Sequence, residues 1–462
     1  MKRIFVYIAM CLGAVPMFSQ VKTSLALWRG AAGEALSLQQ LKDSALRNNI
    51  AMRTAQLDIE VAQQQRKEAF TNFFPNVNGT GMWFNANRGM AKMDMNPSEM
   101  ISPEMGASLS QMLPAEALAA LGSPVSISMM KNGTIGSLMA VQPIFAGGQI
   151  INGNKLAKVG VDVSRLQFEL SEDEVLRQTE QYYWQLVSMQ QKVKTVEAVE
   201  SLLQGICKDV DVAVRAGVAM NNDLLQVQLR QNEIESQKLK LENGISIVSL
   251  LLAQYCGLGC DSLSIEVGSM SVDDSSLVAH VSDDAALRSL PEYQLLLKQV
   301  EAAKLQRKIE VGKNLPSVGI GAGYNYHNLM DNDRTFGMVF ATVSVPISDW
   351  WGGSHAIKRR KMQQQKAEAQ FTDNSQLLKI RMQKAWNDVQ ESYRQLGIAR
   401  RSIEQAEENL RLNKNYYKAG TCRMSDLLEA QSQWQQTHSN LIDAYAQYKM
   451  CETEYRRVTG GL

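Results

Sequence analysis

Long apolar runs are missing from this sequence once its amino-terminal segment has passed. Past residue 20, no apolar run in the 462-residue chain reaches the roughly 18 residues that a membrane-spanning α-helix needs. An excess of charge is also missing, because 48 Lys and Arg residues nearly balance 47 Asp and Glu residues. With a formal net charge of +1, no overall field attracts the chain to nucleic acid, and no such partner is expected.

Motifs for catalysis and metal binding are missing too. No nucleophile elbow or phosphate-binding loop occurs. The cysteines after residue 20 are odd in number, which excludes a closed disulfide framework. Among them, Cys256 and Cys260 are left open as two thiols or one small disulfide. We therefore expect no enzyme activity, no cofactor and no metal site. The histidines are scattered without the spacing of metal ligands: His280, His327, His355 and His438.

The amino terminus has the features of a secretory signal. Two basic residues at positions 2 and 3 precede an apolar stretch that ends at Phe18, as export signals require. We predict a signal peptide over residues 1–26, with cleavage near residue 19 or 26. Lipidation of Cys11 is left open, although Met10 stands where a lipoprotein signal needs a small residue.

The rest of the chain repeats itself. Pro75 and Pro316 lie in similar tetrapeptides 241 residues apart, and Pro143 matches Pro346 at an offset of 203. Self-similarity at a fixed offset indicates two copies of one unit, the first with a longer insert between its prolines. The predicted parts are a first repeat at 36–256 (strands at about 75–84 and 134–144, a Met-rich loop at 85–133, a coiled-coil hairpin at 147–256), a linker at 257–276, and a second repeat at 277–460 (strands at about 316–326 and 335–345, a hairpin at 352–459).

The strands and helices are predicted from different periods. Alternate residues from Val318 to Tyr326 are apolar, and the residues between them are glycines or Asn325. This period of two fits a strand between lipid and a wet lumen. Pro75 and Pro316 are expected to start strands, and Pro143 and Pro346 to end them. Apolar residues recur every seven positions in the helices, which predicts left-handed coiled coils. The series are Val161 to Val210, Met382 to Tyr417 and Leu427 to Tyr455.

Strands and helices together predict a channel. Four strands are too few to close a membrane barrel, which needs about eight, and open sheet edges are not tolerated in lipid. Copies of the chain must therefore pool their strands. The fold class expected is mainly α, with a contribution to a shared membrane β-barrel and long helices that continue its wall into water.

The insert at residues 85–133 is rich in methionine and contains four prolines. We expect a loop there with at most short helices. Thioethers ligate soft metal ions such as Cu(I), but methionine is also an ordinary filler of irregular packing, and packing is favoured.

The two turns between long helices share a pattern. Gly217 and Gly420 are each suited to a helix end, and Asp223 and Asp426 each follow near the start of the next helix, where the helix dipole favours an acidic residue. Helix capping is a sufficient local explanation for the position of both carboxylates.

With the doubled Ala-Gly…Asp-Leu-Leu turn, the Pro143-to-Gly148 junction and the repeat, the sequence resembles the TolC-like outer-membrane factor family over about residues 36–460. The resemblance implies a homotrimer with a 12-stranded barrel in outer-membrane lipid and a periplasmic α-helical tunnel. It also implies a periplasmic adaptor and an inner-membrane transporter as partners, and passive efflux as the function.

The resemblance also implies roles for residues in the turns. It places Asp426 and Glu429 at the constriction of the periplasmic mouth, and Asp223 and Tyr417 in a latch between helices. An arginine of the family's latch is replaced by Cys422, and Arg423 follows it. The turn residues expected to contact the adaptor are Ala216, Gly217, Ala419 and Gly420.

Two alternatives share many of these features. A conduit for type I protein secretion would have nearly the same sequence pattern. An exported coiled-coil scaffold or adaptor would share the helices, but it would have no use for strands bounded by prolines and aromatic residues.

Overall fold

The computed structural model describes most of the chain after residue 34. The predicted signal peptide, Cys11, Cys260 and most of the linker and Met-rich insert lie outside the described residues. By their contacts, the residues form two compact units, each built from several stretches of chain. The residues described are 35–88, 91–96, 101–102, 105, 114, 125–130, 132–259, 263–266, 280, 283–329 and 332–460.

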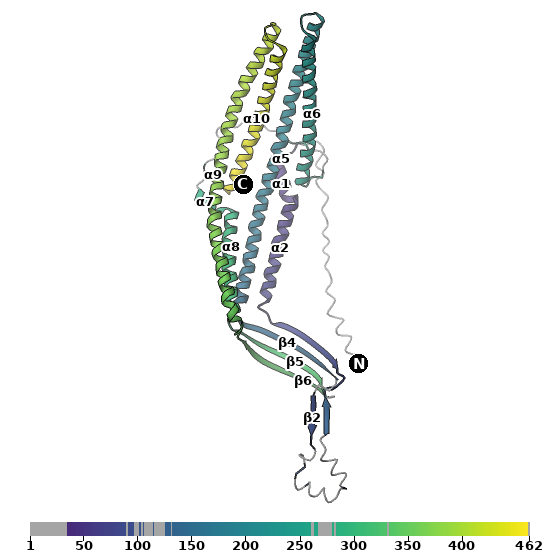
Figure 1. Ribbon diagram of the computed structural model, residues 1–462, viewed down its shortest axis with the longest axis vertical. Coiled ribbons are helices and arrows are strands. Elements are labelled where there is room, and N and C mark those ends of the chain that lie inside the picture. The colour runs from purple at the N-terminus through teal and green to yellow at the C-terminus, as the bar shows by residue number, and fades with distance from the viewer. Residues whose placement is uncertain are drawn as a thin grey trace. The chain divides into compact units, whose positions relative to one another are not determined.

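One unit, Thr54–Ser171 with Val281–Gln383, contains a four-stranded antiparallel sheet of order β1-β4-β5-β6 (Figure 1). Pro75 and Pro316 directly precede β1 and β5, where a missing N–H is tolerated. The expectation that Pro143 ends a strand is wrong: it lies inside β4 at a β-bulge, which accepts a residue that cannot donate to the ladder. The strands are β1 (Asn76–Asn85), β4 (Asn132–Ala146), β5 (Ser317–Leu329) and β6 (Asn332–Ser344).

Most of the exposed apolar side chains of the sheet lie on one face, although Met82, Phe336 and Met338 are exposed on the other. Directly paired residues of an antiparallel sheet share a face, so the strand register shows which side chains lie on the same face. Val339, for example, pairs with Ala322 and is 86% exposed. Asn78, Thr80 and Asn325 lie on the opposite face. The exposed apolar residues that share the face of Val339, called the apolar face below, are Val77, Trp83, Leu138, Ile320, Tyr324 and Val343.

The insert contains regular structure that the sequence analysis missed. Strands β2 (Ala91–Met95) and β3 (Val125–Met129) form an antiparallel two-stranded sheet, where only a loop with short helices was expected. Their sequences alternate, with Met93 and Met95 flanking Asp94, and this period of two is typical of a strand. The alternation was not recognised because many methionines and prolines lie nearby.

The helices follow the same order in each half. Helices α2 (Ile50–Thr71) and α8 (Pro291–Lys313) precede β1 and β5, and α1 (Leu38–Asn48) and α7 (Asp283–Ser289) precede them in turn. The long helices are α5 (Gln149–Arg215) and α9 (Asp349–Lys418), each followed by a 35-residue partner, α6 (Asn221–Tyr255) or α10 (Met424–Val458). None of the helices in the described ranges is both long and apolar enough to cross a membrane.

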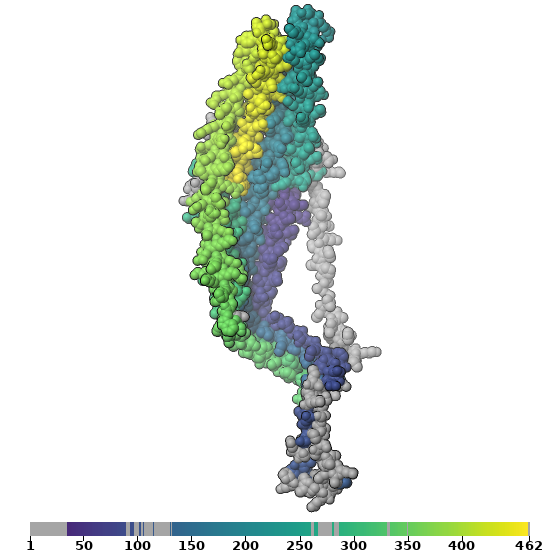
Figure 2. Space-filling view, viewed as in Figure 1, coloured from purple at the N-terminus to yellow at the C-terminus, as the bar shows by residue number. Residues whose placement is uncertain are grey.

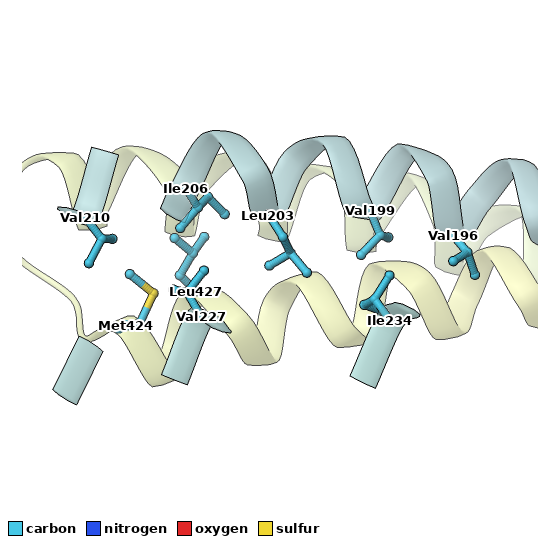
Figure 3. Packing of buried hydrophobic residues seen from close by; sticks show 9 residues of the cluster. All are labelled: Val196, Val199, Leu203, Ile206, Val210, Val227, Ile234, Met424 and Leu427. Carbon is cyan, nitrogen blue, oxygen red and sulfur yellow. The ribbon is translucent and has the colours of Figure 1, made fainter. Parts of the chain in front are cut away.

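The other unit, Met1–Arg53, Glu172–His280 and Lys384–Leu462, is packed through the predicted seven-residue series. Val196, Leu203 and Val210 of α5 are buried against Val227 of α6 and Leu427 of α10 (Figure 3). Burying each such side chain contributes roughly 1.5–3 kcal/mol. The seam therefore fixes the three helices near their turns.

Candidate functional site

Both turns of the long-helix unit end their first helix with the same hydrogen-bond motif. Gly217, at φ +75°, donates to the Val214 carbonyl, and Val218 donates to the Ala213 carbonyl. Gly420, at φ +71°, has the equivalent pair of bonds. These are Schellman motifs, which require a left-handed residue that glycine supplies without strain. Ala216 and Ala419 precede the two glycines, so all four predicted turn residues lie at the helix ends.

The two aspartates cap the helices that leave the turns. Asp223 Oδ2 accepts from the Met220 backbone N–H at 3.4 Å, and Asp426 Oδ2 accepts from the Arg423 N–H at 3.1 Å. Each carboxylate lies in the first helical turn, where it satisfies a donor that the helix leaves free and interacts with the positive end of the dipole. Capping is therefore one role of both residues, and it leaves their charge in place.

Helix α10 presents its acidic residues away from its packed face. Met424 and Leu427 are buried in the seam, while Asp426 and Glu429 are exposed one turn apart. Residues three apart on a helix share a face. The structure thus places the two predicted constriction residues together, on a face that packing leaves open to water.

Tyr417 and Asp223 interact electrostatically across the two hairpins. Burial of the Tyr417 phenol raises its pKa, and the negative charge of Asp223 raises it further. Among the described residues no hydrogen bond joins the two side chains; Asp223 Oδ2 accepts from the Met220 N–H instead. The neutral phenol remains a possible donor, because a raised pKa keeps its proton in place.

The ion pair that the family's arginine would form in this turn is replaced by neither Cys422 nor Arg423. The thiol of Cys422 donates to the Asn413 carbonyl at 3.5 Å, and burial raises its pKa, with a smaller contribution from Asp426. Arg423 is exposed, and its guanidinium makes no ion pair with any carboxylate that the structure describes. Cys422 thus binds locally, within its own turn.

A polar layer joins α6 to α10, and the sequence analysis missed it. Arg230 of α6 donates from Nε to Gln431 Oε1 at 3.1 Å and from Nη2 to Gln435 Oε1 at 3.1 Å. Gln435 in turn donates to Gln237 Oε1 at 2.7 Å. Gln431 is fully buried, so these groups depend on one another for hydrogen bonds. The sequence does contain a signal for this layer: Gln431 and Gln435 are polar residues that follow Leu427 at intervals of four, on the packed face of the helix.

Comparisons with known proteins were consistent in family and fold. Residues 284–461 match the family model "Outer membrane efflux protein". The comparison with curated protein sequences gave no match.

Solved outer-membrane channels have a similar structure. The CmeC channel of Campylobacter jejuni matches with a TM-score of 0.73 at 15% identity, covering 92% of this chain and 85% of CmeC. VceC of Vibrio cholerae matches with a TM-score of 0.71 at 14% identity, covering 92% and 96%. MtrE of Neisseria gonorrhoeae matches with a TM-score of 0.71 at 14% identity, covering 92% and 89%.

The structural matches confirm the fold class that the sequence predicted, and the family model supports the predicted family over residues 284–461. At such low identity the structural likeness establishes the fold, while the family model covers only residues 284–461. Residues 284–461 therefore belong to the outer membrane efflux protein family, and the chain as a whole has the fold of a TolC-like outer-membrane factor.

Proposed function

We propose that the protein is the outer-membrane channel subunit of a tripartite efflux system. The observation that carries this proposal is an open sheet with an exposed apolar face, in a chain that also forms two long helical hairpins. Exposed apolar residues such as Val339 and Val343 suit contact with lipid tails, which a water-facing sheet would not need.

The sheet supports assembly as a homotrimer. Strands β1 and β6 each pair on one side only, and unpaired strand edges are costly in lipid. Joining the β6 edge of one copy to the β1 edge of the next removes both. Three copies supply 12 strands, above the minimum of about eight for a membrane barrel.

The transport mechanism proposed is passive conduction through a gated mouth. Exposed Asp426 and Glu429 side chains from three copies would form a negative ring near the axis, which favours cations and binds them when the mouth is narrow. Tyr417 and Asp223 would hold neighbouring hairpins together in the closed state. Opening would move the hairpins about the turns at Gly217 and Gly420.

The partners proposed are a periplasmic adaptor and an inner-membrane transporter. The first turn exposes Val218 and Met220 beside Ala216 and Gly217, and exposed apolar groups at a tip favour protein contact. The second turn offers Ala419 and Gly420 at the matching position. The transporter would supply the energy, because the chain carries no nucleotide-binding motif.

Purification and conductance measurements test this function. The mature protein should require detergent, migrate as a heat-modifiable trimer and form discrete conducting channels in planar bilayers. A soluble, elongated monomer without conductance would instead support the scaffold alternative. A conduit for type I protein secretion would behave as a channel in the same assay, and identification of the transporter that co-purifies with the trimer would distinguish it.

A further inference from the structure

The helical segments next to the sheet carry a local excess of positive charge. Residues 302–314 of α8 and 350–367 of α9 contain nine basic residues and one acidic residue, a net charge of +8 in a chain of net charge +1. The equivalent segments of the first half, 61–73 and 147–164, contain four basic and two acidic residues. The same helices can therefore be built without this charge, so packing does not explain it.

The basic residues line two grooves. The α8 groove, of about 510 Å³, is lined by Asn152, Lys304, Arg307, Lys308, Val311 and Gln364. The α9 groove, of about 440 Å³, is lined by His355, Lys358, Arg359, Met362, Gln363 and Lys366. Each combines cationic groups with one apolar side chain, Val311 or Met362, which suits a ligand that has an anionic group and a hydrocarbon part. Figure 2 shows the surface of α9, in green, adjoining the sheet.

Several of these cations have no counter-charge among the residues that the structure describes. Lys304 lies 3.7 Å from Glu368. In contrast, Lys308, Lys358, Arg359 and Lys366 form no ion pair within the described part of the chain, and the three on α9 are exposed. Like charges this close repel one another. An anionic ligand would relieve that repulsion, and basic residues near an anionic membrane surface strengthen binding to it.

The grooves lie where lipid headgroups would reach them. Trp351, at the start of α9, is 82% exposed, and exposed tryptophans mark the boundary between lipid tails and headgroups. Lys358 follows seven residues later, roughly 10 Å along the helix at about 1.5 Å per residue. A lysine side chain extends several ångströms back toward the headgroup layer, so this separation is small enough for contact.

We propose that the α8 and α9 grooves bind anionic phospholipids of the leaflet that faces the periplasm. The phosphodiester and any second anionic group contact Lys308, Lys358 and Arg359, while Val311 and Met362 pack against the lipid's glycerol and upper acyl carbons. This inference rests on the proposed function, because it requires the adjoining sheet to lie in the outer membrane. It explains why a chain without overall charge concentrates basic residues beside its sheet.

Lipid binding to the intact protein tests the proposal. The trimer in detergent is titrated with phosphatidylglycerol or with phosphatidylethanolamine, and bound lipids are counted by native mass spectrometry. The wild type should bind phosphatidylglycerol at least tenfold more tightly. The triple variant Lys308→Gln, Lys358→Gln, Arg359→Gln should lose this preference to within twofold. The matched control Arg400→Gln, Arg401→Gln, Lys414→Gln removes the same charge from exposed positions farther along α9 and should keep it.

Two results would overturn the proposal. One is an unchanged lipid preference in the first triple variant, and the other is no preference in the wild type. The reversal potential of the channels distinguishes a third arrangement: if the first triple variant shifts ion selectivity and leaves lipid binding unchanged, the grooves face the conduction path instead. Absence of conductance in all three proteins would reject the channel function itself, a readout separate from the lipid ratio.

Discussion

At the scale of single residues, the proposed gate would give a second task to side chains that already cap helices. Asp223 and Asp426 each accept a backbone N–H at a helix start, and both carboxyl groups lie beside the turns. A cap and a gate are compatible, because the capping bond uses one oxygen of each carboxylate; the other oxygen of Asp426 accepts from the exposed Ser425 hydroxyl. Asp426 is also exposed. Substitutions that keep the shape and remove the charge therefore separate the two tasks.

The acidic pair on α10 should control block by divalent cations. Replacing Asp426→Asn together with Glu429→Gln removes six negative charges from a trimer and should raise the half-blocking concentration of Mg²⁺ at least tenfold, because the cation loses its counter-charges. Single-channel recordings measure this. The control Glu391→Gln with Glu404→Gln removes the same charge from exposed positions of α9 and should leave the block unchanged. Equal block in both variants would reject the ring.

Tyr417 should hold the mouth closed. Removing its hydroxyl in Tyr417→Phe should raise resting conductance by a factor of about five per subunit, the equivalent of one net hydrogen bond of about 1 kcal/mol. Tyr416→Phe, a half-exposed neighbour, is the control. No difference between the two variants would argue against a latch.

The same phenol predicts a pH dependence. Burial and Asp223 raise the pKa of Tyr417, so the folded state holds this proton more tightly than the unfolded chain does. The stability that the neutral Tyr417 phenol contributes is fully present below the ordinary pKa of tyrosine. It is lost as the pH rises through the higher pKa of the folded state. Resting conductance should therefore increase only at strongly alkaline pH, and the increase should be smaller in Tyr417→Phe.

Arg230 should couple the two hairpins. Replacing Arg230→Met keeps much of the side chain but leaves Gln431 Oε1 without its donor, while Gln435 Oε1 keeps only the Gln431 amide. A buried unsatisfied polar group costs about 1–3 kcal/mol. Thermal unfolding followed by circular dichroism should show a lower midpoint. The exposed Arg394→Met serves as control and should have little effect; equal midpoints would show that the network adds no stability.

At the scale of elements, two kinds of glycine join helices to their neighbours. Gly217 has a positive φ with open space around it, whereas a side chain on Gly147, also at positive φ, would lie 2.1 Å from the Gly312 carbonyl oxygen. The turn therefore depends on backbone conformation alone. The junction between sheet and helix also depends on close contact between the backbones at Gly147 and Gly312. Neither backbone can move unless the element that contains it moves too.

These two glycines should respond differently to alanine. Gly217→Ala should cost about 1–2 kcal/mol, the strain of a left-handed residue with a Cβ. Gly147→Ala should cost at least twice as much, since the Cβ also displaces the main chain at Gly312. Thermal midpoints of the two single variants check the order, and equal midpoints would show that the junction relaxes freely.

At the scale of the whole molecule, the sheet determines where the protein resides. Its apolar face suits lipid, and the residues one step along each strand face the other way. Val339 and Asn78 lie in neighbouring rows of the sheet but on opposite faces. They form a matched pair for deciding which face contacts lipid.

Arginine at these two positions should have unequal effects. Val339→Arg places a charge among lipid tails and should destabilise the membrane-inserted trimer by about 2–4 kcal/mol. Asn78→Arg on the lumen side should cost far less and should change ion selectivity. The fraction of heat-modifiable trimer after reconstitution is the measurement. A larger loss for Asn78→Arg would reverse the assignment of the faces.

The sequence by itself determined the strand period around Val318, the seven-residue series and the glycine turns, because each depends on local geometry that repeats along the chain. It also identified the family through motifs that lie close together in sequence. It did not identify β2 and β3, whose alternation is only five residues long in each strand. Short periods of this kind are ambiguous until a partner strand is known.

Only the tertiary structure brought distant residues together. The Arg230 layer joins side chains 201 and 205 residues apart, and the bulge at Pro143 depends on pairing with β5. The apolar face also required the register of four strands, because exposure is a property of the assembled sheet. Local periodicity selects elements, but contacts between elements are set by packing and hydrogen bonding across the fold, and these decided where the proposed gate residues, the seam and the basic grooves lie.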